Sequence, residues 1–336
     1  MKKKNAIVFS VTFIITLAVL AGVYYALNTS FLAQKPSENP ASSGAANTSS
    51  ESLPVVNNEK VTTFLLCGLD LSERLTDVIM VVSMDTEKNE VNVLQIPRDT
   101  YVGINRYATG KINAVYGTEK KGTTPIGRLI DEIGHTFKLP IDHYATVNIP
   151  GLKKIVDSMG GVEVDIPQDI NFGPGETIKK GKQTLNGQKA EWFVRYRKGY
   201  YNGDIGRMHA QSLFLEACAN KALQMSNTQI LSLLTQDYKN MTTDLTVAQM
   251  MGYYGSVRSL KPENIHFYAL EGAGLMHESY SVYSIDKQKA ADLLNQHFRP
   301  GSEPVSAEDL NIVELKAEQT MAQGTSGDEP SENAEP

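Results

Sequence analysis

Cysteine is scarce in this chain, with two among 336 residues. Neither cysteine has the spacing of a metal ligand, which argues against a zinc site. Cys67 lies in an apolar, strand-like run and Cys218 on the apolar face of a predicted helix, so we expect two buried free thiols. A single bridge between them remains the alternative. The six histidines show no paired helical spacing, and no internal repeat is present.

The first 27 residues have the pattern of a membrane anchor. Three lysines in residues 1–5 precede an uncharged, mostly apolar run at 6–27, long enough for a helix of about 20 residues to cross a hydrocarbon core of about 30 Å. No basic residue follows until Lys35, so we expect residues 1–5 to stay cytoplasmic and the rest to lie outside. A cleaved signal peptide is the alternative. However, the run ends with Tyr24 and Tyr25, which suit a membrane interface, and has no convincing cleavage site.

Two segments with little core-forming character flank the predicted domain. Residues 28–60 are rich in Ser, Asn, Ala and Pro and are expected to form a flexible extracellular tether. Residues 301–336 contain nine acidic residues and one lysine, a net charge of −8, and are expected to form a disordered tail. Because the whole chain carries −6, residues 1–300 carry about +2. We therefore expect one large folded domain at 61–300.

The hydrophobic pattern of this domain predicts an α/β fold: a single layered domain with a central mixed β-sheet flanked by helices. Predicted strands are dense in Val, Ile and Leu, as in strands buried on both faces. They are Thr62–Leu69, Val78–Met84, Val91–Ile96, Tyr144–Asn148, Val162–Ile166 and His266–Leu270. Helical periodicity is found at Lys111–Tyr116, Pro125–Phe137, Gly151–Met159, Leu185–Phe193, Ile205–Met225, Thr246–Ser259 and Ile285–Phe298.

Arginines concentrate near the start of the long helix predicted at 205–225. Arg207 and Gln211 are four residues apart, so they share a face of its first turns, where the helix dipole favours a phosphate. Arg195 and Arg197 share one face if their segment is extended. Arg98 follows the third predicted strand. Because guanidinium forks fit phosphate oxygens, this group suggests a polyanionic ligand such as a pyrophosphate. Taken singly, each arginine could instead pair with an ordinary structural carboxylate.

Three aspartates follow or begin predicted strands, where ligands bind in α/β domains. Asp70 ends the first strand and Asp77 begins the second, and a Mg²⁺ ion bridging phosphates usually needs one or two such carboxylates. Asp99 follows Arg98 directly and is placed to orient an arginine. Ordinary turn chemistry is the alternative for Asp70 and Asp77.

The motifs in this domain resemble those of the LytR-CpsA-Psr family, and they occur in order over most of it. The matching segments are Thr76–Met84, Ile96–Tyr101, Lys111–Ala114, Ile141–Tyr144 with Val147 and Asn148, Gly160–Val162, Leu185–Gly187 with Ala190, Val194–Arg197, and Asp204–Arg207 with Gln211. One departure is present. Family members commonly place an arginine two residues before the second aspartate, whereas here Leu75 takes that position and Arg74 precedes it.

The resemblance implies a Mg²⁺-dependent phosphotransferase that moves a glycopolymer from a polyprenyl-pyrophosphate carrier to peptidoglycan. By position, Asp70 and Asp77 match the magnesium-binding carboxylates, and Asp99 matches a position near the phosphates. The matches to pyrophosphate-binding groups are Arg98, Arg195, Arg197, Arg207 and Gln211, with Arg74 the weakest candidate. An apolar groove for the lipid is implied without named residues.

Two other functions remain open from the sequence. The chain could bind lipid-linked wall precursors without catalysis, or hydrolyse the pyrophosphate of the lipid-linked glycan with the same metal and arginines. Nucleic-acid binding is not expected, because the domain lies outside the membrane and lacks a basic recognition helix. The identity of the transferred polymer is not encoded in these motifs.

Overall fold

The computed structural model describes residues 61–103, 109–197, 199–200, 204–257, 260, 264–300 and 302–315. The cytoplasmic tail, transmembrane helix and tether predicted within residues 1–60 lie outside this part. Within the described residues, no helix combines the length and the apolar character needed to cross a bilayer.

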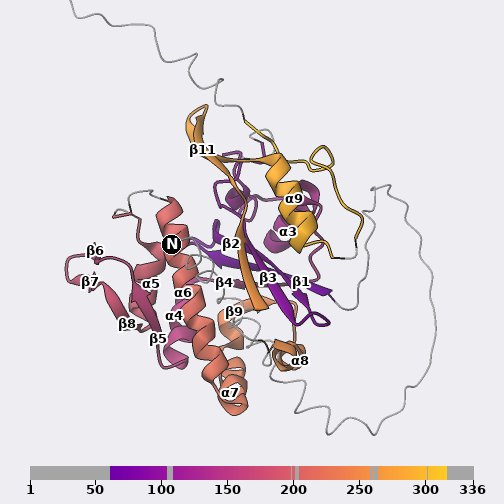
Figure 1. The fold of residues 1–336 in the computed structure, drawn as a ribbon. Helices are drawn as coiled ribbons and strands as arrows, with labels where there is room; N and C mark the ends of the chain where they lie inside the picture. Colours follow the sequence, from indigo (N-terminus) through magenta and orange to yellow (C-terminus); the bar gives the residue numbers. More distant parts are fainter. Residues whose placement is uncertain are drawn as a thin grey trace, which may run out of the picture.

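A six-stranded mixed sheet forms the centre of the domain (Figure 1). Its strand order is β10-β3-β2-β1-β4-β9. The strands are β1 (Val61–Leu69), β2 (Thr76–Asp85), β3 (Glu90–Gln95), β4 (His143–Val147), β9 (Met241–Thr243) and β10 (Ile265–Ala269). The pairs β1–β4 and β3–β10 are parallel, and the pairs β1–β2, β2–β3 and β4–β9 are antiparallel. The predicted mixed sheet is confirmed.

Seven helices are found in the described part of the chain. They are α3 (Pro125–Phe137), α4 (Ile149–Ser158), α5 (Gly187–Arg195), α6 (Asp204–Gln224), α7 (Asn227–Asp237), α8 (Val247–Val257) and α9 (Lys287–His297). Local capping explains several starts: the Thr124, Asn148 and Asn186 side chains each accept a hydrogen bond from a first-turn amide. The helix predicted at Lys111–Tyr116 is wrong in extent, because only a short 3₁₀ turn forms there, η1 (Ile112–Ala114).

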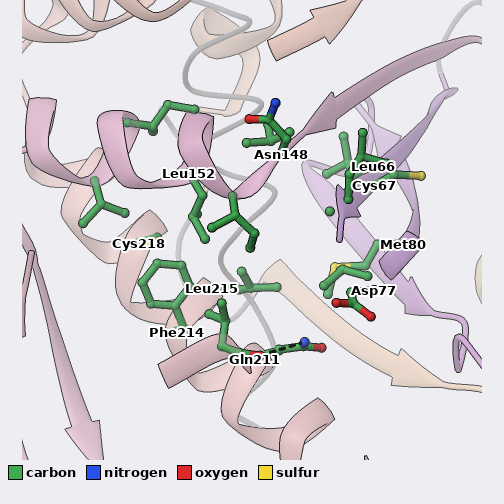
Figure 2. Close-up of a pocket in the computed structure, with 18 of the residues that line it drawn as sticks. Leu66, Cys67, Asp77, Met80, Asn148, Leu152, Gln211, Phe214, Leu215 and Cys218 are labelled. Atoms are coloured by element: carbon green, nitrogen blue, oxygen red, sulfur yellow. Dashed lines mark hydrogen bonds between the residues drawn. The ribbon is translucent and has the colours of Figure 1, made fainter. Parts of the chain in front are cut away.

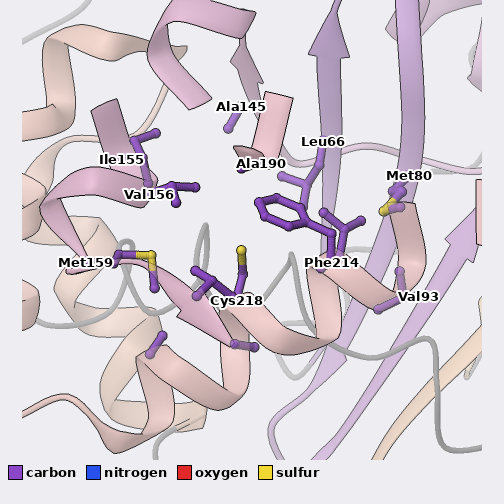
Figure 3. Close-up of a cluster of buried hydrophobic side chains, with 14 of the residues drawn as sticks. Leu66, Met80, Val93, Ala145, Ile155, Val156, Met159, Ala190, Phe214 and Cys218 are labelled. Atoms are coloured by element: carbon purple, nitrogen blue, oxygen red, sulfur yellow. The ribbon is translucent and has the colours of Figure 1, made fainter. Parts of the chain in front are cut away.

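Alternate residues of the central strands pack into two separate cores, one on each face of the sheet. Phe64 and Leu66 of β1 face the core covered by α4, α5, α6, α7 and α8. Leu65 and Cys67 face the core covered by α3 and α9. Figure 3 shows Leu66 and Met80 of the first core beside α4 and α6 side chains. The result is a helix–sheet–helix sandwich, and the predicted burial of strands on both faces is confirmed.

Several elements were not predicted from the sequence. They include helix α7, strand β8 (Gly181–Leu185), which pairs with the predicted β5 (Val162–Ile166), the hairpin β6 (Ile170–Gly173) with β7 (Glu176–Ile178), and the hairpin β11 (Gly272–His277) with β12 (Tyr280–Ile285). Only β5 of these strands was expected. Helix α7 had a sequence signal, since Ser226 and Gln229 form a capping box. Strand β11 begins with a glycine-containing stretch, which lacks the alternation of apolar and polar side chains that indicates a strand.

The folded domain continues beyond the boundary predicted at residue 300. Leu310 is 1% exposed and Ile312 is 7% exposed, and both pack in the core beneath α3 and α9. The Asn311 amide donates to the Thr136 carbonyl (3.1 Å), which fixes the segment to the end of α3. Leu310 and Ile312 therefore hold residues 302–315 against the domain, although the acidic composition of this segment predicted disorder. The rest of the predicted tail lies outside the described residues.

Both cysteines are buried and free, as predicted. They occupy opposite faces of the sheet, because Cys67 packs with the α3 side and Cys218 with the α6 side. Burial raises the pKa of both thiols well above their usual range. Neither is therefore an activated nucleophile.

Glu216 on α6 predicts a pH-dependent loss of stability. Burial raises the pKa of its carboxyl from 4.5 to about 7. The native state thus holds a proton between pH 4.5 and 7 that the unfolded chain has released, so stability falls as pH rises through this window. We expect Glu216→Gln to stabilise the protein at pH 8 by on the order of 1–2 kcal/mol, a value reduced because water screens this half-buried group.

The measurement is urea unfolding at pH 5 and pH 8, with the exposed Glu278→Gln as the matched control. The Glu216 variant should lose less stability between the two pH values than the wild type. Equal losses in the wild type and both variants would contradict the burial of a protonated Glu216.

Candidate active site

One edge of the sheet gathers the predicted site residues. Strands β1 and β4 are parallel and end together, with Gly68 opposite Val147, and β2 begins at the same edge opposite Leu69. Strand β3 also ends there, because Ile96 donates its amide to the Ile79 carbonyl (3.0 Å). The residues that follow these ends are therefore neighbours in space although they are distant in sequence.

Asp77, the second residue of β2, is the centre of the arginine group. Its Oδ1 accepts a hydrogen bond from Arg98 Nη1 at 2.6 Å. The same oxygen lies 3.8 Å from Arg197 Nη2 and 4.0 Å from Arg207 Nη1. Three predicted arginines thus converge on one carboxylate. Their excess of positive charge over Asp77 is suited to an additional anion.

Arg207 and Gln211 occupy one face of α6, as their spacing predicted. Arg207 is 1% exposed, which is unusual for arginine, and Gln211 is 3% exposed. The Gln211 side chain donates from Nε2 to the Val194 carbonyl (3.1 Å), while its Oε1 has no hydrogen-bond partner among the described residues. A buried amide oxygen without a partner can accept a hydrogen bond from a ligand or from a water molecule.

Arg195 does not join Asp77, so the idea that Arg195 and Arg197 act from one extended face is wrong. Arg195 is the last residue of α5, and the backbone becomes extended only at Tyr196. Its Nη1 donates to Glu191 Oε1 at 2.6 Å, and its guanidinium lies 5.4 Å from the centre of the Phe172 ring. Arg195 still lines the pocket described below. It forms part of the pocket's rim while its charge is balanced by Glu191.

Asp99 lies on the loop after β3 and orients neighbouring cations. Its Oδ1 accepts from Lys111 Nζ at 3.1 Å, and its Oδ2 lies 3.9 Å from Arg98 Nη2. Hairpin β11–β12 holds this loop through backbone hydrogen bonds, from the Tyr283 amide to Asp99 and from the Tyr101 amide to Tyr283. Lys111 was quoted in a motif but not predicted as a site residue. Lys111 therefore adds a positive charge beside Asp99 and Arg98 that the sequence did not predict.

Asp70 has a clear structural role at the end of β1. Its Oδ1 accepts from the amides of Arg74 and Leu75, both at 3.0 Å, and its Oδ2 accepts from Ser72 Oγ at 2.6 Å. Partial burial acts to raise the pKa of Asp70, but these hydrogen bonds outweigh it and lower the pKa below its usual value. The side chain of Arg74 is exposed on this loop. The turn chemistry considered as an alternative for Asp70 is therefore present.

Asp70 and Asp77 are the ligands that the sequence predicts for a magnesium ion. No three His, Cys, Asp or Glu side chains cluster in the described part of the chain, so these residues form no all-protein cage. Mg²⁺ usually takes one or two carboxylates and fills its octahedron with water and phosphate oxygens. Asp70 and Asp77 are carboxylates of the right type at one sheet edge. They fit this open arrangement, whereas a closed site would need more ligands.

Asp70→Asn separates the turn role from a metal role. The asparagine retains an oxygen that can accept from the Arg74 and Leu75 amides, so we expect the midpoint of thermal unfolding to shift by no more than about 5 °C. If Asp70 also holds Mg²⁺, the activity should need at least tenfold more magnesium. The measurement is a magnesium titration of turnover. The control is Ser72→Ala, which removes a turn hydrogen bond but no carboxylate and should keep the wild-type magnesium requirement. If Asp70 serves the turn alone, Asp70→Asn should keep the wild-type magnesium requirement as well.

An apolar pocket runs from this polar edge into the domain. It has about 1000 Å³ of empty space, its open mouth included. The floor is formed by sheet residues such as Leu66 and Met80, and the walls by Leu152 of α4 and Phe214 of α6. Figure 2 shows Asp77 and Gln211 together on one side of the pocket, with Leu152, Phe214 and Cys218 farther from Asp77. A ligand with an anionic head and a long apolar tail fits this arrangement.

Known proteins are similar to this chain in sequence and fold. A model of the LytR_cpsA_psr family matches residues 23–299. The polyisoprenyl-teichoic acid–peptidoglycan teichoic acid transferase TagU of Enterococcus faecalis is 27% identical over 304 residues, 86% of this chain and 94% of the relative. TagU of Bacillus mycoides, described in the same words, is 30% identical over 258 residues, 74% of this chain and 82% of the relative. The crystal structure of B. subtilis TagV superposes with a TM-score of 0.62 and 25% identity, covering 71% of this chain and 98% of that one.

Proposed function

Because this chain belongs to the LytR_cpsA_psr family, we propose that it transfers a wall glycopolymer from a polyprenyl-pyrophosphate carrier to peptidoglycan and forms a phosphodiester. One observation carries the proposal: the apolar pocket opens directly at Asp77, where three arginines converge. Both TagU relatives are named as polyisoprenyl-teichoic acid–peptidoglycan teichoic acid transferases, which supports a teichoic acid as the polymer.

The apolar pocket binds the polyprenyl chain. Most of its lining is aliphatic or aromatic, and polar side chains are confined to its rim. Each methylene that leaves water contributes about 0.8 kcal/mol, so a long isoprenoid gains most of its binding free energy here. The lipid therefore fixes the position of the pyrophosphate at the rim.

The arginines bind the pyrophosphate. Arg98, Arg197 and Arg207 supply fixed cationic donors around Asp77, and Gln211 adds a neutral contact. Asp70 and Asp77 would hold Mg²⁺, which when bound would neutralise charge on the phosphate oxygens. Asp99 keeps Lys111 and Arg98 oriented toward the same place.

The transfer step replaces a phosphoanhydride bond of the donor's pyrophosphate with a new phosphoester bond to the acceptor. An acceptor hydroxyl oxygen attacks the phosphorus next to the glycan, the bond from that phosphorus to the bridging oxygen breaks, and polyprenyl monophosphate leaves with the bridging oxygen. The hydroxyl proton passes to solvent water as the new bond forms. Negative charge grows on the transferring and leaving oxygens, where Arg98, Arg197 and Arg207 stabilise it without rearranging.

We place the protein in the cell membrane as a single-pass protein with a cytoplasmic N-terminus. The order of charges around residues 6–27 supports this topology, and an extracellular domain would meet both lipid carrier and wall.

The direct test incubates the full chain with a polyprenyl-pyrophosphate glycan, Mg²⁺ and peptidoglycan. The expected product is peptidoglycan that carries the glycan. Release of lipid phosphate without glycan on peptidoglycan would instead identify a pyrophosphatase, and binding without any product would identify a binding protein. Either of these outcomes would overturn the proposed transfer.

A further inference from the structure

A second, polar pocket lies beside the apolar one at the same sheet edge. It has about 670 Å³ of empty space, its open mouth included. It shares two lining residues, Leu69 and Asn148, with the apolar pocket. Because Leu69 precedes Asp70 and ends β1, the second pocket lies next to the predicted site of phosphate chemistry. Nothing in the proposed binding of lipid and pyrophosphate uses it.

The side chains that line this pocket are those that bind sugars and their anionic substituents. Thr146, Thr242 and Tyr116 bring hydroxyl groups, and Asn148 and Asn240 bring amides. The charged side chains of the lining are Lys154 on α4, Lys239 on η2 (Tyr238–Asn240) and Glu73, whose carboxylate accepts a hydrogen bond from Asn148. Lys154 Nζ donates to Asn240 Oδ1 (3.4 Å), which joins α4 to the end of η2, and Lys239 precedes Asn240 in the sequence. The two lysines outnumber the single carboxylate, so the pocket favours a ligand that carries a carboxylate or another anion.

Asn148 connects the polar pocket to the reaction edge. Its Oδ1 accepts from the Gly151 amide at 2.8 Å, and its Nδ2 donates to Glu73 Oε1 at 2.6 Å. Gly151 fits against the Asn240 carbonyl so closely that an added Cβ would lie 2.2 Å from that oxygen. The wall between α4 and η2 is thus tightly packed, and the pocket is preformed.

We propose that this polar pocket binds the acceptor, a peptidoglycan strand whose carboxylates pair with Lys154 and Lys239. The inference rests on the proposed function. Two parts of the donor already have binding sites in the proposed function. The lipid lies in the apolar pocket, and the pyrophosphate lies at the arginines. The attacking hydroxyl must still be held beside the phosphorus, and this pocket is the adjoining space with sugar-binding chemistry.

The test compares steady-state kinetics of the full chain and the double variant Lys154→Ala/Lys239→Ala, with donor and soluble peptidoglycan fragment varied separately. We expect the acceptor KM to rise at least tenfold, with kcat and donor KM within twofold of wild type. The control is Lys179→Ala/Lys182→Ala, which removes the same charge from side chains that are 71% and 75% exposed and outside the pocket. It should leave the acceptor KM unchanged.

A binding arm separates this inference from the proposed function. The same peptidoglycan fragment is titrated into each protein without donor, at low and high salt. Loss of binding in the Lys154/Lys239 variant alone supports the acceptor pocket even if the wild type forms no product. An unchanged acceptor KM and unchanged fragment binding would overturn it, as would a rise confined to the donor KM, which would assign the pocket to the donor glycan.

Discussion

Arg98→Ala is expected to lower kcat by about 10²–10³, equivalent to about 2.7–4 kcal/mol of lost stabilisation of the transition state. Arg98 makes the 2.6 Å hydrogen bond to Asp77 and borders Asp99, so its removal takes a fixed donor from the centre of the site. Arg98→Lys should recover only part of the rate, because an ammonium keeps the charge but not the planar fork.

The Arg98 variants should be measured beside Arg74→Ala, since Arg74 is an exposed arginine on a neighbouring loop. We expect that variant to stay within about threefold of wild type, by the small effect usual for exposed charges. Full activity of Arg98→Ala in a protein with an unchanged unfolding midpoint would remove Arg98 from the site. Arg207→Ala is a weaker test, because Arg207 is 1% exposed and its truncation would also disturb the fold.

Leu152→Trp is expected to raise the KM for a long-chain donor roughly 100-fold, and to raise it far less for a donor with a short isoprenoid. Leu152 projects from α4 into the apolar pocket, where a larger side chain would displace part of the lipid (Figure 2). Loss of contact with about three to four methylene equivalents, at about 0.8 kcal/mol each, corresponds to a change of this size. The measurement is donor KM as a function of isoprenoid length.

The matched control is Leu293→Trp, a partly buried leucine of α9 that packs against the opposite core. It tests whether a new tryptophan harms activity through general overpacking, which costs about 1–3 kcal/mol of stability. Equal KM values of the Leu152 variant and wild type for every donor length would exclude the pocket as the lipid site.

The strands and the charged site residues were accessible from sequence for physical reasons. Strands buried on both faces give continuous apolar runs, so β1, β2 and β3 were predicted close to their observed bounds. The fixed spacing of Arg207 and Gln211 on one helix likewise placed both on one face. Arg195 shows the limit of this reasoning, because its position depended on where α5 ends, and the helix includes it.

The apolar pocket and the polar pocket could not be predicted in the same way. Leu152, Phe214 and Met80 have the pattern of ordinary core residues, and only the packing of α4 and α6 over the sheet leaves space between them. Lys154 and Lys239 are separated by 85 positions and line the same pocket because β9 pairs with β4. The packing of residues 302–315 was not predicted because the segment is acidic overall. Two buried apolar side chains are enough to hold it against the domain.

The measurement that tests the transfer most directly follows the phosphorus atom next to the glycan. The full chain is given a donor with an isotopic label on that phosphorus only, together with Mg²⁺ and peptidoglycan, and the products are separated. The proposed function predicts that the label appears in a phosphodiester on peptidoglycan and that the released polyprenyl monophosphate is unlabelled. Label found only in soluble glycan phosphate, or glycan joined to peptidoglycan without it, would contradict the proposed function.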